Sequence, residues 1–330
     1  MRVLVTGGAG FIGSHFVGRL AGAGDEVVVL DKLTYAGNPA NLDGVEHEFH
    51  QGDICDPDAV AAAAQGCEAI VNFAAESHVD RSILGPAEFI LTDVLGTQVL
   101  LDHARHAGIR LVQVSTDEVY GDIPLDALPC TEDAPLRPSS PYSASKTGGD
   151  LQVLAYVRTY EVDACITRGA NNFGPRQYPE KLIPLFITNA FDGSDLPVYG
   201  DGRQQREWLH ADDYSSAIEL VMREAPPGEV YNVGGQEHQN MDVVRKILDL
   251  TGASPDLVRH VEDRPGHDRR YSVDSSKIRA LGWAPAHSFG GGGLAETVAW
   301  YREHRGWWEP IKSGEYRSYY EQQYGRRLAG

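Results

Sequence analysis

"VLVTGGAGFIGSH" (residues 3–15) decides the fold of this chain, because an apolar strand pattern runs directly into a glycine loop and then into a helical pattern. Glycines at such a turn let the backbone approach a pyrophosphate, and the free N–H groups of the helix N-terminus bind it. Strand, loop and helix in this order, at the first βα unit, predict a dinucleotide site. The residues expected to bind are Gly7, Gly10, Phe11, Ile12 and Gly13.

Outward from this stretch, short apolar runs alternate with helical patterns. Such alternation predicts an α/β fold, a Rossmann-like doubly wound parallel sheet with helices on both faces. After about residue 170 the elements become shorter and are interrupted by Pro and Gly, which predicts a smaller, interleaved C-terminal lobe. The expected domains are 1–170 and 171–330, with a helix at 211–223 and a strand at 229–233 returning to the first. Strands are expected near 2–6, 26–30, 47–51, 68–73, 110–114 and 162–167, and helices near 11–22, 56–64, 87–107, 141–160 and 295–302.

Composition excludes several classes of protein. A formal net charge of −18 over 330 residues disfavours binding to nucleic acid or to an anionic membrane. No apolar run approaches the about 20 residues of a membrane span, and the first residues are too short an apolar run for a signal peptide, so we expect a cytoplasmic protein. The four scattered cysteines predict neither a disulfide framework nor a metal site.

The second strand, "EVVVLD", indicates which cofactor binds. It ends at Asp31, where a carboxylate can accept hydrogen bonds from the adenosine ribose. This favours NAD over NADP, although the neighbouring Lys32 weakens the argument. The alternative is that Asp31 is a strand-end aspartate without a role in cofactor binding. "GDI" (52–54) and "FAAES" (73–77) end the next two strands at the edge where such sheets bind ligands. They add Asp53, Ile54, Phe73, Ala74, Ala75 and Ser77 to the cofactor site.

"STDEVYG" (115–121) places two carboxylates, Asp117 and Glu118, directly after an apolar strand pattern. The alternative is a helix start, because Ser115 and Glu118 fit the spacing of a capping box. Gly121 and Pro124 leave room for barely one turn, so the sequence favours a functional site. Adjacent residues on a continuing strand face opposite ways, so we expect the strand to end near Ser115.

"PYSASK" (141–146) places Tyr142 and Lys146 on one face of a helix. An ammonium group beside a tyrosine favours the phenolate, so Lys146 is expected to lower the pKa of Tyr142 and make it a base for a hydroxyl group. The alternative is a half-buried aromatic ring and a surface charge. With the glycine loop, the set resembles the extended short-chain dehydrogenase/reductase family, with Thr116 beside Tyr142.

Seven motifs narrow this resemblance: "STDEVYG", "ESHVDRS", "PYSASK", "NNFGP", "PEKLIPL", "REWLHADD" and "DRPGHDRRY". From Met1 to about Tyr320 the chain resembles the dTDP-glucose 4,6-dehydratases. The resemblance implies that Tyr142 deprotonates the sugar 4-hydroxyl while NAD takes the C4 hydride. Glu118 then removes the C5 proton, protonated Asp117 releases the C6 hydroxyl as water, and the hydride returns to C6. The product is a 4-keto-6-deoxy sugar for deoxysugar biosynthesis.

The same resemblance assigns further residues. It adds Lys32, Thr34, Thr92, Tyr142, Lys146 and Asn172 to the cofactor site. Around the nucleotide sugar it implies Ser77, His78, Thr116, Asn171, Lys181, Leu182, Pro197, Tyr199, Arg206, Asn240, Arg264, His267 and Tyr271. Three residues depart from the family pattern. Gly169 and Phe173 replace larger or hydroxylated residues, which we interpret as packing changes, and Asp93 stands where asparagine is common and is expected to weaken NAD binding modestly.

Rival functions remain on the same fold. A nucleotide-sugar 4-epimerase needs no acid at C6, and a UDP-glucuronate decarboxylase must host a carboxylate that Asp117 and Glu118 repel. A catalytically silent NAD-binding regulator is the alternative from another class. The regions 87–107 and 141–160 are apolar over more than one stripe, which predicts a homodimer through these helices.

Overall fold

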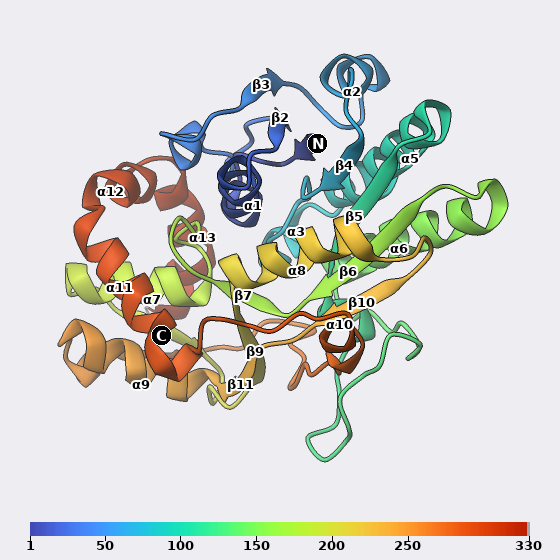
Figure 1. Ribbon diagram of the computed structural model, residues 1–330. Coiled ribbons are helices and arrows are strands. Elements are labelled where there is room, and N and C mark those ends of the chain that lie inside the picture. Colours follow the sequence, from blue (N-terminus) through green and yellow to red (C-terminus); the bar gives the residue numbers. More distant parts are fainter. Residues whose placement is uncertain (329–330) are drawn as a thin grey trace.

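The computed structural model describes residues 1–328, so the last two residues of the predicted C-terminal lobe, 329–330, lie outside the described residues. Its centre is a seven-stranded parallel sheet in the order β10-β6-β5-β4-β1-β2-β3 (Figure 1). The predicted Rossmann-like fold is confirmed. The strands are β1 (Arg2–Thr6), β2 (Glu26–Asp31), β3 (Glu48–Gln51), β4 (Ala69–Asn72), β5 (Arg110–Thr116), β6 (Ala164–Gly169) and β10 (Val230–Val233).

Helices cover both faces of this sheet, because successive side chains of each buried strand point to opposite sides. On β1, Val3 and Val5 belong to the core beneath α1 (Phe11–Gly22) and α8 (Ala211–Glu224). Leu4 belongs to the opposite core. The helices over that face are α2 (Pro57–Ala63), α5 (Thr97–Ala107) and α6 (Pro141–Tyr160).

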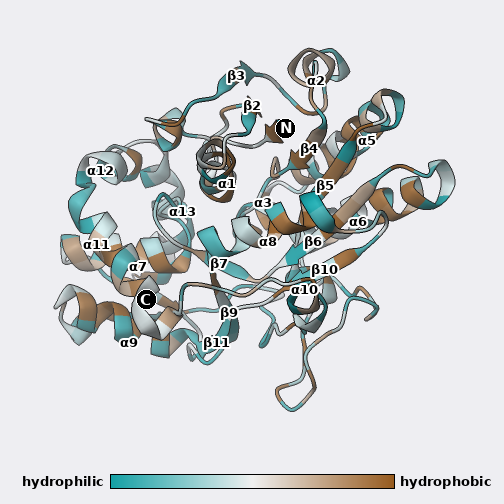
Figure 2. Cartoon of the chain, in the orientation of Figure 1, coloured by the Kyte–Doolittle hydropathy of each residue, from teal (hydrophilic) through white to brown (hydrophobic). Residues whose placement is uncertain are grey.

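A second lobe contains two small sheets, β11-β9-β7 and β12-β8, and its own hydrophobic core. In Figure 1 its later helices, in orange and red, lie beside the central sheet, and in Figure 2 helices such as α7 and α9 carry both hydrophobic and hydrophilic segments. Its strands are β7 (Asn171–Phe173), β8 (Leu196–Tyr199), β9 (Gln205–His210), β11 (Gln236–Gln239) and β12 (Val258–Val261). Its helices are α7 (Leu182–Asp192), α9 (Asn240–Thr251), α11 (Leu294–Glu303), α12 (Arg305–Ser313) and α13 (Glu315–Leu328). The short helix α10 (Ser276–Ala280) instead packs against β10, and its Ile278 belongs to a core of the central sheet.

Within residues 1–170, the structure differs from the expected elements mainly in the following ways. The single helix predicted over 87–107 is divided into α4 (Ala87–Ile90), a wider π-helical turn at Leu91–Gly96, and α5. A further short helix, α3 (Val79–Leu84), precedes it and was not predicted. The sixth strand begins two residues later than expected, at Ala164. None of the helices in the described chain combines the length and the apolar character that a membrane span requires.

Candidate active site

Two adjoining cavities, of ≈ 340 Å³ and ≈ 170 Å³, lie at the carboxyl edge of the central sheet. Glu118, Asn171 and Lys181 line both, so the two cavities form one continuous site. Every residue assigned to the cofactor from the sequence lines the larger cavity. Every residue assigned to the substrate lines one cavity or the other.

The glycine loop has the close backbone approaches that a pyrophosphate site requires. Gly7 adopts a φ of +67°, and a Cβ there lies only 2.6 Å from the backbone nitrogen of Ala74. A Cβ on Gly13 lies 2.3 Å from the carbonyl oxygen of Gly7. No side chain caps the N-terminus of α1 at Gly10, so its N–H groups face the larger cavity without a side-chain acceptor. These residues therefore fit a dinucleotide.

Asp31 ends β2 at the rim of the same cavity. Its carboxylate accepts hydrogen bonds from the backbone N–H groups of Ala9, at 2.9 Å, and Leu33, at 2.8 Å, which fix its orientation. Lys32, the residue that counted towards NADP, forms an ion pair with Asp53 at 2.8 Å. This pairing lowers the pKa of Asp53 against the effect of burial, and it engages the one cation adjacent to Asp31.

The paired carboxylates lie on a single turn at the end of β5. The strand runs to Thr116, and one 3₁₀ turn, Asp117–Tyr120, follows it. The helix-start alternative is thus partly right, but the cap is Thr116 and not Ser115: the Thr116 hydroxyl accepts from the Glu118 N–H at 3.2 Å. The turn lets both carboxylates line the larger cavity, which a continuing strand would prevent.

The two carboxyl groups have different electrostatic surroundings. Burial raises the pKa of Asp117 well above its usual range, and the charges of Glu118 and Glu207 raise it further. Its Oδ2 is buried and has no hydrogen-bond partner in residues 1–328. Burial also raises the pKa of Glu118, but Arg264, Arg206 and Lys181 oppose this rise. Burial therefore favours the protonated form of both groups, and nearby carboxylates strengthen this tendency at Asp117 while three cations oppose it at Glu118.

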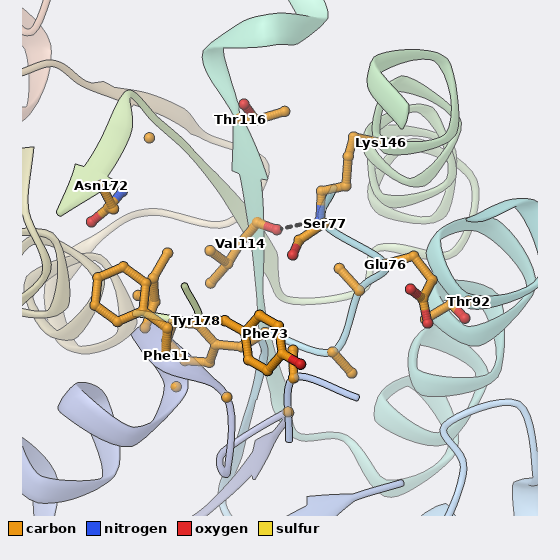
Figure 3. Close-up of a pocket in the computed structure, with 18 of the residues that line it drawn as sticks. Phe11, Phe73, Glu76, Ser77, Thr92, Val114, Thr116, Lys146, Asn172 and Tyr178 are labelled. Carbon is orange, nitrogen blue, oxygen red and sulfur yellow. Dashed lines mark hydrogen bonds between the residues drawn. The ribbon is translucent and has the colours of Figure 1, made fainter. Parts of the chain in front are cut away.

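Tyr142 and Lys146 lie together on α6, as predicted, and Tyr142 hydrogen-bonds Thr116. The lowered pKa that was predicted for Tyr142 is not found in this structure. Burial raises that pKa well above its usual value, and the charges of Glu118 and Asp93 raise it further. Figure 3 shows the Lys146 side chain reaching the carbonyl oxygen of Val114, to which its ammonium donates a hydrogen bond at 2.7 Å.

The smaller cavity gathers the positive charge that an anionic ligand requires. Lys181 lines both cavities and donates to the carbonyl oxygen of Ser77. The Arg206 guanidinium lies 4.2 Å from the centre of the Tyr271 ring, where it also donates to the carbonyl oxygen of Asp268 at 2.8 Å. Arg264 keeps one buried nitrogen, Nη1, without a partner in the described chain.

Several lining residues were missed by sequence reasoning. Glu180 and Trp208 lie within the motifs quoted above, so the neighbouring residues could have indicated that they line the site. Tyr324 lies on α13, where no motif indicated a role. Tyr214 also lines the larger cavity, and it packs against Gly169, one of the three residues that depart from the family pattern. A Cβ on Gly169 would lie 2.4 Å from Cζ of Tyr214. The Gly169 departure is therefore a packing change, as interpreted, and it admits a ring that lines the larger cavity. Phe173 likewise packs on Phe289, with ring centres 5.1 Å apart.

One cluster of possible metal ligands lies outside both cavities. Ligand atoms of His210, Asp212 and His287 lie within 4.8 Å of one another. The two imidazole rings are stacked with their centres 4.2 Å apart, and Asp212 already pairs with His15 at 2.5 Å. Stacked rings direct their in-plane lone pairs side by side rather than at a shared point. These contacts are those of a packed polar cluster, and the absence of a metal site stays a prediction.

A glycine loop at the first βα unit and a Tyr142–Lys146 pair beside Thr116 together define an enzyme of the extended short-chain dehydrogenase/reductase class. Within that class, the chain belongs to the GDP-mannose 4,6 dehydratase family, whose model matches residues 4–293. The resemblance to dTDP-glucose 4,6-dehydratases that the motifs indicated is confirmed by the similar proteins described next.

Two curated relatives cover nearly the whole chain. The dTDP-glucose 4,6-dehydratase of Streptomyces niveus is 54% identical over 326 residues, which span 95% of this chain and 96% of the relative. The dTDP-glucose 4,6-dehydratase 1 of Escherichia coli K12 is 46% identical over 361 aligned positions, which span 99% and 100% of the two chains. Among solved structures, DesIV (dTDP-glucose 4,6-dehydratase) from Streptomyces venezuelae, whose bound molecules include NAD, is 56% identical, with a TM-score of 0.91 over 94% of this chain and 100% of that one.

Proposed function

We propose that this chain is an NAD-dependent dTDP-glucose 4,6-dehydratase, a lyase that converts dTDP-glucose to dTDP-4-keto-6-deoxyglucose for deoxysugar biosynthesis. The observation that carries the proposal is the Asp117–Glu118 turn, which brings two carboxyl groups of different character into the cavity that Tyr142 and Lys146 also line. Relatives named for this activity cover 94–95% of the chain.

NAD, when bound, accepts the hydride from C4 of the sugar and later returns it to C6. The residues that would hold it are the glycine loop at the N-terminus of α1, Asp31 at the ribose, and the strand-end residues Asp53, Phe73 and Ser77, all of which line the larger cavity. Tyr142, Lys146 and Thr92 line the same cavity.

Tyr142 is the base for the first step. Its hydroxyl shares a hydrogen bond with Thr116, so both side chains can contact one substrate oxygen, the 4-hydroxyl. Because burial and neighbouring carboxylates raise the pKa of Tyr142, the Lys146 ammonium is needed to stabilise the phenolate as it forms. Removal of this proton accompanies loss of the C4 hydride and leaves a ketone at C4.

Elimination of water then uses the carboxylate pair. The C4 ketone makes the C5–H acidic, and Glu118, held toward the charged state by three cations, is the base that takes this proton. Asp117 keeps its proton in its buried position and donates it to the departing C6 hydroxyl. After the hydride returns to C6 and a proton returns to C5, the balance is loss of one water.

Lys181, Arg206 and Arg264 are the proposed ligands of the substrate diphosphate. A chain with a net charge of −18 attracts an anion only where cations are concentrated, and all three line the smaller cavity. Tyr271 and His267 line the same wall. With the remaining assigned residues, they would enclose the base, the phosphates and the sugar.

Incubation of the purified protein with dTDP-glucose tests this function. The expected product is lighter than the substrate by one water, as measured by mass spectrometry, with no net reduction of added NAD. A product of unchanged mass but altered sugar stereochemistry indicates a 4-epimerase. Release of CO₂ from UDP-glucuronate indicates a decarboxylase, and no turnover of any of these substrates, with retained NAD binding, indicates a regulator. UDP-glucose in parallel measures how strictly dTDP is required.

We also propose a homodimer, a cytoplasmic location and a functional division of the chain. Exposed apolar side chains gather on the predicted dimer helices: Ile90 (51% exposed), Leu91 (46%), Leu95 (41%) and Leu151 (53%). A second copy covering them supports the dimer, and a monomeric mass at micromolar concentration would exclude it. Cell fractionation tests the location. In the proposed division, residues 1–170 bind NAD and 171–330 bind the nucleotide sugar, with α8 and β10 returning to the first part.

A further inference from the structure

Asp93 is a buried carboxylate behind the catalytic tyrosine and lysine. It lies on the π-helical turn Leu91–Gly96 and is 1% exposed. Its Oδ2 accepts a hydrogen bond from the Ser145 hydroxyl at 2.5 Å, and its Oδ1 has no hydrogen-bond partner among the side-chain contacts of residues 1–328. Burial of a carboxylate with so few partners is costly, and the proposed reaction steps assign it no role.

The charged groups that face Asp93 come from two neighbouring segments. From α6, the Lys146 ammonium attracts its negative charge and Tyr142 lies within its field. From the loop after β4, the Glu76 carboxylate repels it, while the nearby Glu76 backbone N–H favours its charged form. Ser145, which donates to Asp93, stands between Tyr142 and Lys146 in the chain. Asp93 is therefore coupled directly to this pair.

Lys146 is itself buried, 4% exposed, and hydrogen-bonds a neutral group, the Val114 carbonyl oxygen. A buried ammonium requires a negative partner. The Asp93 and Asp150 carboxylates both interact with its charge, but Asp150 already pairs with Arg168 at 2.9 Å. This leaves two candidates: the Asp93 carboxylate, and the Tyr142 phenolate, which forms only during C4 oxidation. The more charge Asp93 carries, the less the Lys146 ammonium favours the phenolate.

We propose that Asp93 is a positioning residue that competes with Tyr142 for the charge of Lys146, and so sets the pH range in which C4 oxidation occurs. This inference rests on the proposed function. Burial raises the pKa of Asp93 to about 6, so its charge changes close to neutral pH. Below that pH Asp93 is neutral, so the Lys146 ammonium stabilises the Tyr142 phenolate without competition from Asp93. Above it the carboxylate opposes deprotonation of Tyr142.

The test compares Asp93→Asn with the unmodified enzyme in the step that uses Tyr142. Asparagine keeps the shape and can still accept from Ser145, but it carries no charge. The measurement is the single-turnover rate at which reduced cofactor appears with dTDP-glucose, followed from pH 5 to 9. In Asp93→Asn the acidic limb of this pH–rate profile is expected to lie about one pH unit lower than in the unmodified enzyme. Glu88→Gln removes a carboxylate from the exposed Glu88 on α4 and is the matched control, with an unmoved limb.

A second measurement does not depend on turnover. In protein labelled with ¹³C at aspartate carboxyl carbons, one resonance is expected to titrate near pH 6 and to be missing from Asp93→Asn. If the unmodified enzyme forms no dehydrated product, the proposed function fails, whereas the resonance still reports on Asp93. If product forms but the limb of Asp93→Asn coincides with that of the unmodified enzyme, or if no aspartate titrates near pH 6, the inference is overturned.

Discussion

Substitution of each carboxylate on the Asp117–Tyr120 turn is expected to stop the reaction at a different point. Glu118→Gln cannot take the C5 proton, so C4 oxidation by Tyr142 proceeds and reduced cofactor accumulates without loss of water. Asp117→Asn leaves Glu118 in place, so the C5 proton is removed reversibly while elimination is slow. The two variants separate the base from the acid although the residues are adjacent in the chain.

The structure sets the size of these effects. Loss of a positioned acid or base costs about 10²–10⁴-fold in rate, which is about 2.7–5.5 kcal/mol of transition-state stabilisation. Because burial keeps Asp117 protonated, Asp117→Asn changes no charge, and its cost is the lost proton alone. Glu118→Gln removes a negative charge facing Arg206 and Arg264, and it also removes one cause of the raised pKa of Asp117. It is therefore expected to cost more.

Heavy water distinguishes the two. With dTDP-glucose in D₂O, recovered substrate from Asp117→Asn should carry deuterium at C5, detected by mass spectrometry and NMR, while Glu118→Gln should show neither exchange nor elimination. An Asn240→Ala variant, which alters a side chain of the smaller cavity and removes no charge near Glu118, serves as a control that reaches normal exchange at saturating substrate. Near-normal dehydration by both carboxylate variants refutes the reasoning, and exchange in Glu118→Gln alone reverses the two roles.

Three other substitutions follow from the geometry. Asp31→Ala should weaken NAD binding by about 1.5–3 kcal/mol and reduce the difference in affinity between NAD and NADP, both measured by calorimetry. Equal binding of both cofactors by the unmodified protein would contradict the role of Asp31. Gly169→Ala should cost about 1–3 kcal/mol of unfolding free energy, because its Cβ would lie 2.4 Å from Cζ of Tyr214, and almost nothing when Tyr214→Ala is also present. Asp150→Asn should lower the free energy of unfolding in urea by about 3–5 kcal/mol, because the Arg168 guanidinium, 2.9 Å away and 2% exposed, loses its buried charged partner. A loss below about 1 kcal/mol, typical of a surface pair, would show that solvent reaches the Arg168 guanidinium.

The parts of this molecule that sequence predicts best are those where one local pattern has one structural meaning. The alternation of Val3, Leu4 and Val5 between two helix layers follows from the twofold period of a strand, and a glycine loop followed by a helix admits few conformations. Asp31, Asp53 and Phe73 were predicted to share one site because the carboxyl ends of parallel strands meet at one edge of a sheet, and all three line the larger cavity. The residues around the nucleotide sugar were assigned by resemblance to a known family, and they too line the cavities.

What sequence could not predict depends on the balance of distant charges. Tyr142 and Lys146 lie on one face of α6, as their spacing requires, but the direction of the tyrosine pKa depends on burial and on Glu118 and Asp93, which reach it from other segments. Spacing along a helix contains no information about such neighbours. In the same way Tyr324 lines the smaller cavity only because α13 packs against the lobe, and nothing near it in the chain indicates this.

The charges of the site explain how two adjacent carboxyl groups can act in opposite senses. On the side of Asp117 stands Glu207, whose pKa burial raises to about 7, and this neighbour opposes ionisation of Asp117. Arg206 and Arg264 favour the ionised form of Glu118. Arg206 also favours that of Asp117, where burial and the neighbouring carboxylates outweigh it. The cations that would hold the substrate diphosphate are thus also those that stabilise the ionised base. Substrate phosphates would neutralise part of this positive charge and so raise the pKa of Glu118, which increases its affinity for the C5 proton and lowers its ionised fraction.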